Sequence, residues 1–148
     1  MSPAERPLQS ATITHFGLSV GDLEAMVAFY TRLGFDEIAR VDFAPAPVRL
    51  VLVRNQAGTA LELTAHSDSA QTAPADSAMD AAKKRGVFQF AMRVTQLEQA
   101  VEESIGAGAR LISAPATNSR GEYRFAFVAD PEGNLIEFVS PPPIDKAP

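Results

Sequence analysis

In the N-terminal half of the chain, the apolar spacing changes from that of a strand to that of a helix. Residues 13–20, ITHFGLSV, alternate apolar and polar side chains, which predicts a half-buried β-strand. A helix is then predicted over 22–33, with Asp22 as its N-cap and Gly34 in the left-handed conformation after its last turn. The apolar stripe of this helix comprises Leu23, Met26, Val27 and Tyr30. Three strands are expected to follow, at 35–42, 47–54 and 59–66.

The second half of the chain repeats this pattern. Residues 15–39 align without a gap with residues 89–113, and residues 47–65 align in the same way with residues 122–140. Matching segments in the same order indicate an internal duplication, so the second copy should contain the same elements. They are predicted at 87–94 (strand), 96–107 (helix), and 109–115, 122–129 and 134–140 (strands).

The duplication sets the expected domain organisation. A single domain, 1–148, should contain two modules, at 11–66 and 86–141, joined by a linker at 67–85. The linker is polar and rich in small residues, with a short helix expected at 76–85. Each module reads as βαβββ, with its helix packed on one face of its sheet, so the fold class is α+β.

The composition of the chain indicates which kinds of partner and which cellular compartment to expect. Apolar residues make up 46% of the chain and charged residues 21%, with a net charge of −5, which argues against a basic nucleic-acid surface. No apolar run approaches the roughly 20 residues that span a bilayer, and the N-terminus lacks the order of a signal peptide. The absence of cysteine excludes disulfides and thiolate metal sites. We expect a cytoplasmic protein with a small-molecule partner and no role in nucleic-acid or membrane binding.

Polar side chains recur at equivalent positions of the two copies, on the strand faces that the helices leave uncovered. Alternation directs Phe16 towards the helix and His15 to the opposite, concave face, where Gln89 is its repeat equivalent. Glu62 and Glu137 are likewise equivalent, and each is flanked by apolar residues of its strand. Burying an uncompensated carboxylate costs several kcal/mol, so two of them indicate a cation between them. The pattern predicts a metal site made by His15, Glu62, Gln89 and Glu137.

Two arginines occupy equivalent positions in the middle strands. Arg49 and Arg124 lie on the same strand faces as Val51 and Ala126, which are expected to be the concave faces, where the two arginines would bind an anionic substrate. The alternative is that both lie at strand ends and reach solvent. His66 ends its strand and is expected to be exposed.

Four segments carry a family resemblance: THFGLSVGDLEAMVAFYTRLGF, ALELTAH, GVFQFAMRV and DPEGNLIEF. They resemble the vicinal oxygen chelate superfamily, which includes glyoxalase I, bleomycin-resistance proteins, methylmalonyl-CoA epimerase and extradiol dioxygenases. The resemblance implies two tandem βαβββ modules whose eight strands form an open, cup-shaped sheet with the helices outside. It also implies metal ligands from the first and fourth strands of each module, at His15, Glu62, Gln89 and Glu137, although many relatives have histidine in place of Gln89. Because a second chain often completes the cup in this family, a homodimer is expected.

The donor set indicates the chemistry. One imidazole, two carboxylates and one amide oxygen suit one divalent metal ion, namely Ni, Co, Zn, Mn or Mg. Together with the resemblance, this predicts a glyoxalase-like lyase or isomerase that stabilises an enediolate of a small carbonyl substrate. Glu137 and Glu62 are the candidate catalytic bases, and the resemblance favours Glu137. A metal-free small-molecule binding or antibiotic-resistance protein is the alternative, and an extradiol dioxygenase is disfavoured because the second histidine that its iron needs is absent.

Overall fold

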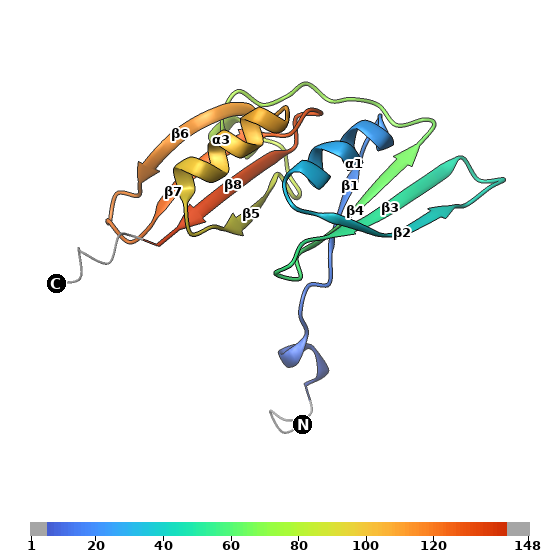
Figure 1. Cartoon of the computed structure of the whole chain (residues 1–148), viewed down its shortest axis with the longest axis horizontal. Coiled ribbons are helices and arrows are strands. Elements are labelled where there is room, and N and C mark those ends of the chain that lie inside the picture. The colour runs from blue at the N-terminus through green and yellow to red at the C-terminus, as the bar shows by residue number, and fades with distance from the viewer. Residues whose placement is uncertain (1–5, 142–148) are drawn as a thin grey trace.

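Each half of the chain folds as a strand, a helix and three further strands, in a computed structural model that describes residues 6–141 (Figure 1). The first module contains β1 (Phe16–Ser19), α1 (Leu23–Arg32), β2 (Asp36–Asp42), β3 (Val48–Arg54) and β4 (Ala60–His66). The second contains β5 (Gln89–Arg93), α3 (Leu97–Ala107), β6 (Arg110–Thr117), β7 (Arg124–Ala129) and β8 (Leu135–Ser140). The α+β fold with two βαβββ modules is confirmed.

The eight strands form two four-stranded sheets. Their orders are β1-β4-β3-β2 (sheet 1) and β5-β8-β7-β6 (sheet 2), and among the described residues no strand of one sheet pairs with a strand of the other. In each sheet the first strand runs parallel to the fourth, and the remaining pairs are antiparallel. The sheets are therefore mixed and open, and β1 and β5 are edge strands at the junction of the modules.

Local sequence signals explain where α1 begins and ends. The Asp22 carboxylate accepts a hydrogen bond of 3.0 Å from the backbone N–H of Ala25, which caps the helix and stabilises it by about 1 kcal/mol. Gly34 follows the last turn with φ of 93°, a left-handed conformation that glycine adopts without strain. The residues predicted to form its apolar stripe are all buried: Leu23, Met26, Val27 and Tyr30.

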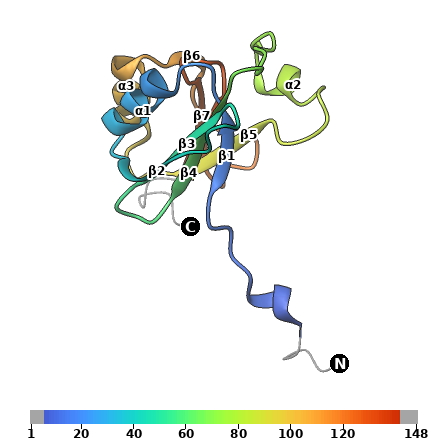
Figure 2. The ribbon, with the colours of Figure 1, turned by 90° about the vertical axis from the view of Figure 1, so that its right-hand side faces the viewer.

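One apolar core spans both modules, because α1 and α3 contact one another on the same side of the two sheets (Figure 2). Small side chains of the middle strands lie beneath the helices, and four of them are 0% exposed: Val51, Val53, Ala126 and Val128. At the junction, the rings of the repeat-equivalent residues Phe16 and Phe90 stack with centroids 6.2 Å apart. The turn between β7 and β8 also reaches the first module, where the Glu132 carboxylate accepts hydrogen bonds from the N–H groups of Gly21 (2.6 Å) and Asp22 (3.0 Å).

The segment that joins the modules forms less helix than predicted. Only Ala78–Ala81, α2, is helical in place of 76–85, although Ser77 caps it by accepting a hydrogen bond of 3.0 Å from the N–H of Asp80. None of the residues of α2 is buried, so tertiary packing does not extend this helix. A short 3-10 helix, η2 (Pro7–Ser10), precedes β1. Within residues 6–141, no helix is long and apolar enough to cross a membrane.

Candidate functional site

The first pair of candidate ligands lies on sheet 1, on the face turned away from α1. Leu61 and Leu63 are fully buried beneath the helix, so alternation places Glu62 between them on the opposite face, where its side chain is 32% exposed. His15 directly precedes β1, which is shorter than the predicted strand. Its Nε2 lies 3.3 Å from Oε2 of Glu62.

Two threonines hold this first pair. Thr64 donates a hydrogen bond of 3.2 Å to Oε1 of Glu62, and Oγ1 of Thr14 lies 2.9 Å from Nδ1 of His15. A threonine hydroxyl can donate or accept, so Thr14 can support either imidazole tautomer. When Thr14 accepts from a protonated Nδ1, Nε2 is left with a lone pair for a metal.

The second pair occupies the equivalent positions of sheet 2. The side-chain amide of Gln89 donates a hydrogen bond of 2.9 Å from Nε2 to Oε2 of Glu137. Ile136 and Phe138, on either side of Glu137, are buried against α3, so the glutamate lies on the opposite face. Oε1 of Gln89 is buried and has no hydrogen-bond partner in the described part of the chain. An unsatisfied buried oxygen is uncommon, and it is an available donor atom for a cation.

The chain does not gather the four residues into one cluster. Among the residues that the structure describes, no three His, Cys, Asp or Glu side chains lie close enough to hold a metal ion. His15 and Glu62 therefore form one pair, and Gln89 and Glu137 form another on the second sheet; each pair is called a candidate half-site below. Both half-sites lie on sheet faces that the helices leave uncovered.

The orientation predicted for Arg49 and Arg124 is wrong. Arg124 forms an ion pair with Glu98 of α3, and its hydrogen bond holds the pKa of Glu98 below its usual range. Arg49 shares the face of Val51, which is fully buried beneath α1. The prediction failed because it took the bulkiest residues to lie under the helices. The small residues lie there, and the bulky ones occupy the half-site faces: Leu50, Leu52, Phe125 and Phe127.

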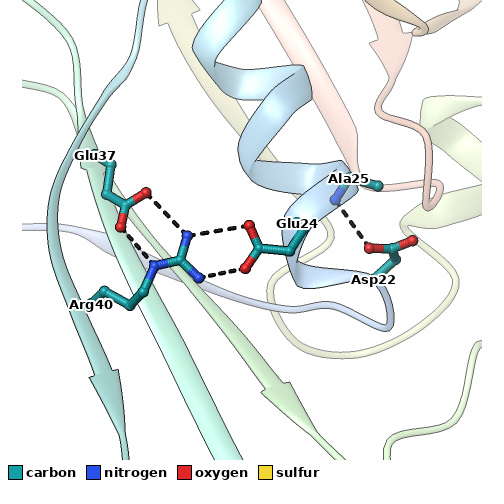
Figure 3. A network of polar contacts seen from close by, with 5 residues as sticks. All are labelled: Asp22, Glu24, Ala25, Glu37 and Arg40. Atoms are coloured by element: carbon teal, nitrogen blue, oxygen red, sulfur yellow. Dashed lines mark hydrogen bonds and ion pairs between the residues drawn. The ribbon is translucent and has the colours of Figure 1, made fainter.

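A further ion-pair network lies between α1 and β2 (Figure 3). Arg40 forms an ion pair with Glu24 of the helix and donates a hydrogen bond of 2.7 Å to Oε1 of Glu37. Its hydrogen bonds lower the pKa of both glutamates. Glu24 and Glu98 are repeat equivalents, so each helix uses the same glutamate to bind an arginine of its own sheet. These solvent-exposed charges attach helix to sheet and lie apart from the half-sites.

Sequence reasoning missed an aromatic row beside Glu137. The Phe125 ring lies 6.1 Å from that of Tyr123 and 5.9 Å from that of Phe127. Phe127 is the direct cross-strand partner of Glu137, so these rings share its face. The spacing of two between the aromatic residues is visible in the sequence, but alternation alone does not say that this face is the one away from α3.

Two cavities lie near the strands that carry the candidate residues. A cavity of about 410 Å³ opens where β1 and β5 meet the linker, and its walls include Phe16, Phe88, Phe90 and Gln89. A second, of about 440 Å³, is lined by His66 and Arg49 among other residues. His66 is exposed, as predicted, and its Nδ1 accepts a hydrogen bond of 2.9 Å from the N–H of Asp68.

Comparisons with known proteins give one family and many structures of the same fold. Residues 12–138 match the family described as Glyoxalase/Bleomycin resistance protein/Dioxygenase superfamily. No curated protein matches the chain.

Three solved structures illustrate the likeness. Glyoxalase I from Zea mays superimposes with a TM-score of 0.71 at 19% identity, over 88% of this chain and 45% of that chain. The trypanothione-dependent glyoxalase I of Leishmania major superimposes with a TM-score of 0.65 at 24% identity, over 88% of this chain and 87% of that chain. A glyoxylase/bleomycin resistance protein/dioxygenase domain from Frankia sp. EAN1pec superimposes with a TM-score of 0.72 at 16% identity, over 88% of this chain and 98% of that chain. At these identities the likeness establishes the fold alone.

Proposed function

Since the chain belongs to the glyoxalase/bleomycin resistance protein/dioxygenase superfamily, we propose that it is a metal-dependent lyase or isomerase of small carbonyl compounds. Its site comprises His15, Glu62, Gln89 and Glu137, and it is completed in a homodimer. His15 and Glu62 of one chain face Gln89 and Glu137 of the other.

The observation that carries this proposal is the separation of the ligands into two half-sites at repeat-equivalent positions. Divalent cations in proteins take four or more donors, so either half-site alone is too small. A two-fold homodimer is self-complementary and would join each half-site to the opposite one of its partner, which makes two identical sites.

The donor groups fit a divalent cation. Glu62 and Glu137 are partly buried among apolar strand residues, where an ionised carboxylate is stabilised by a nearby positive charge. Oε1 of Gln89 is buried and has no hydrogen-bond partner among residues 6–141. To join Glu137 in binding a cation, the Gln89 amide must turn this oxygen towards the site, which ends its present hydrogen bond to Glu137.

Glu137 is the favoured catalytic base. When bound, a divalent cation would polarise a carbonyl oxygen and make the adjacent C–H more acidic. Glu137 then takes the proton from that carbon and returns it to the neighbouring one. Within residues 6–141, Glu137 accepts a hydrogen bond from Gln89, whereas Glu62 contacts both His15 and Thr64. Glu137 is therefore the less constrained of the two carboxylates.

Metal content tests the proposal. Protein purified without chelator should contain about one divalent ion per chain, and added Ni or Zn should raise its melting temperature while EDTA lowers it. A ligand at 100 times its Kd adds about 2.7 kcal/mol to the free energy of unfolding. A protein with neither bound metal nor a metal-dependent melt would instead be the metal-free binding protein.

A further inference from the structure

One row of residues crosses sheet 2 next to the Gln89–Glu137 half-site. Phe125 of β7 pairs with Val139 of β8, and Val139 pairs with Arg93 of β5. Ala91, two residues before Arg93, is the partner of Glu137, so alternation places the whole row on the face of Glu137. The row has an aromatic ring at one end, a small apolar side chain in the middle and a guanidinium at the other end.

The aromatic end is a property of the second module alone. Phe125 contacts the rings of Tyr123 and Phe127, with centroids 6.1 and 5.9 Å away, and Tyr123 is 36% exposed. Their repeat equivalents in sheet 1 are aliphatic: Val48, Leu50 and Leu52. Partly exposed aromatic side chains that follow one another on one face of a strand offer ring faces and edges to a planar ligand.

The cationic end of the row is exposed to solvent. Arg93 is exposed, and among the described residues no carboxylate lies within 4.0 Å of its guanidinium. Arg40 and Arg124, in contrast, bind glutamates of the helices. The repeat equivalent of Arg93 is Ser19, so sheet 1 has no cation at this position.

We infer that this row binds an aromatic acid as the substrate. The ring packs against Phe125 above Val139, and the anionic group binds Arg93. Phe125 and Arg93 are separated by two strand spacings, so their Cα atoms are about 10 Å apart. One aryl acid and the two side chains fill this distance. Glu137 lies in the adjacent row, beside the bound molecule, and in this respect the inference rests on the proposed function.

Calorimetric titration of the metal-loaded protein with phenylglyoxylate tests the inference. Pyruvate has the same 2-oxo acid without the ring, and methyl phenylglyoxylate has the ring without the charge. The wild-type protein should prefer phenylglyoxylate to both. Arg93→Ala should weaken phenylglyoxylate about 10-fold to 100-fold, because it removes one charged hydrogen-bond donor, and should leave the ester unchanged.

Two further variants separate the ring from the charge. Phe125→Leu introduces the residue that sheet 1 has at this position, and it should weaken phenylglyoxylate several-fold without affecting pyruvate. Arg49→Ala is the matched control, since Arg49 is an exposed strand arginine on the helix side of sheet 1, and it should change neither affinity.

Metal content, measured on the same samples, distinguishes the possible failures. A metal-bound protein without preference for the aryl acid, or one in which Arg93→Ala has no effect, overturns the inference alone. Binding of phenylglyoxylate through Arg93 by a protein that takes up no metal supports the inference and overturns the proposed function. A protein that binds neither metal nor phenylglyoxylate overturns both the inference and the proposed function. If Arg93→Ala dissociates the dimer and leaves affinity unchanged, the row is a subunit interface and the inference is wrong.

Discussion

Tyr30 of α1 donates a hydrogen bond of 2.7 Å to Oδ2 of Asp130, at the turn between β7 and β8, and thereby joins the two modules. The repeat equivalents of these residues, Ser104 and Asn55, do not form such a bond. The Ser104 hydroxyl donates to the carbonyl of Val101, and Asn55 accepts from the N–H of Thr59. The duplication has therefore diverged where the modules meet, and only one of the two equivalent turns contacts the neighbouring helix in this way.

The first prediction concerns this contact. Burial raises the pKa of Asp130, and the hydrogen bond from Tyr30 opposes that rise. Tyr30→Phe removes a donor to a buried carboxylate and should lower the free energy of unfolding by about 1.5–3 kcal/mol near neutral pH. Urea unfolding measures the effect. Tyr123→Phe is the matched control, with an expected change within about 0.5 kcal/mol, because Tyr123 is partly exposed and outside this contact.

The pH dependence of the same variant has a definite sign. Because the pKa of Asp130 is higher in the folded chain than in the unfolded one, its contribution to stability is full below the unfolded pKa and is lost as pH rises through the folded pKa. Tyr30→Phe raises the folded pKa further. The stability difference between wild type and variant should therefore shrink when unfolding is repeated near pH 4, and a difference that grows on acidification would contradict this account.

The sequence predicted the fold well because its signals were local and occurred twice. Alternation, the Asp22 cap and the glycine after α1 each act within a few residues, and the structure has the predicted elements within a few residues of their expected bounds. The linker helix was overestimated because helix propensity without a buried face does not sustain a helix.

The site was predicted less completely. Alternation predicted that all four candidate ligands lie on the faces away from the helices. Which of them lie next to each other, His15 beside Glu62 and Gln89 beside Glu137, came from the structure. Alternation alone does not say which of the two sheet faces the helix covers. The orientation predicted for Arg124 was wrong for this reason. Nor does alternation give the distance between two sheets that share no strand pairing, and that distance decides whether the half-sites meet within one chain.

A second prediction tests the conformations of two glycines. An added Cβ at Gly34 or Gly106 meets no atom within 4 Å, so alanine there changes backbone energetics alone. Gly34 has φ of 93°, and Gly34→Ala should cost about 1–2 kcal/mol. Gly106 lies in the exposed surface of α3, and Gly106→Ala should add about 0.5–1 kcal/mol. Thermal melts with the same sign for both variants would contradict the assigned helix end.

A third prediction tests whether two chains share each metal site. His15→Ala disables one half-site and Glu137→Ala the other, so neither homodimer should bind metal tightly. Mixed chains form heterodimers in which one site combines two intact half-sites, and an equal mixture should recover about a quarter of the wild-type metal content. The subunits are unfolded and refolded together, and metal is then measured.

The matched control for this mixture combines two changes in one half-site. His15→Ala mixed with Glu62→Ala leaves every dimer with both copies of the first half-site damaged, so metal should not return. The site does not span two chains if metal binding returns in this control mixture, or if it fails to return in the mixture of His15→Ala with Glu137→Ala.

The last prediction separates the roles of the two carboxylates. Glu137→Gln keeps an oxygen for the cation and removes the base, so the variant should retain most of its metal and nearly all of its stability. It should lose turnover and solvent-deuterium exchange at the substrate carbon by about 10²–10⁴-fold, the usual contribution of general-base catalysis. Glu62→Gln is the control, because Glu62 also contacts His15 and Thr64, and its exchange should fall less. Wild-type exchange in Glu137→Gln with loss in Glu62→Gln would reverse the roles. Unchanged exchange in both variants would mean that neither glutamate abstracts the proton.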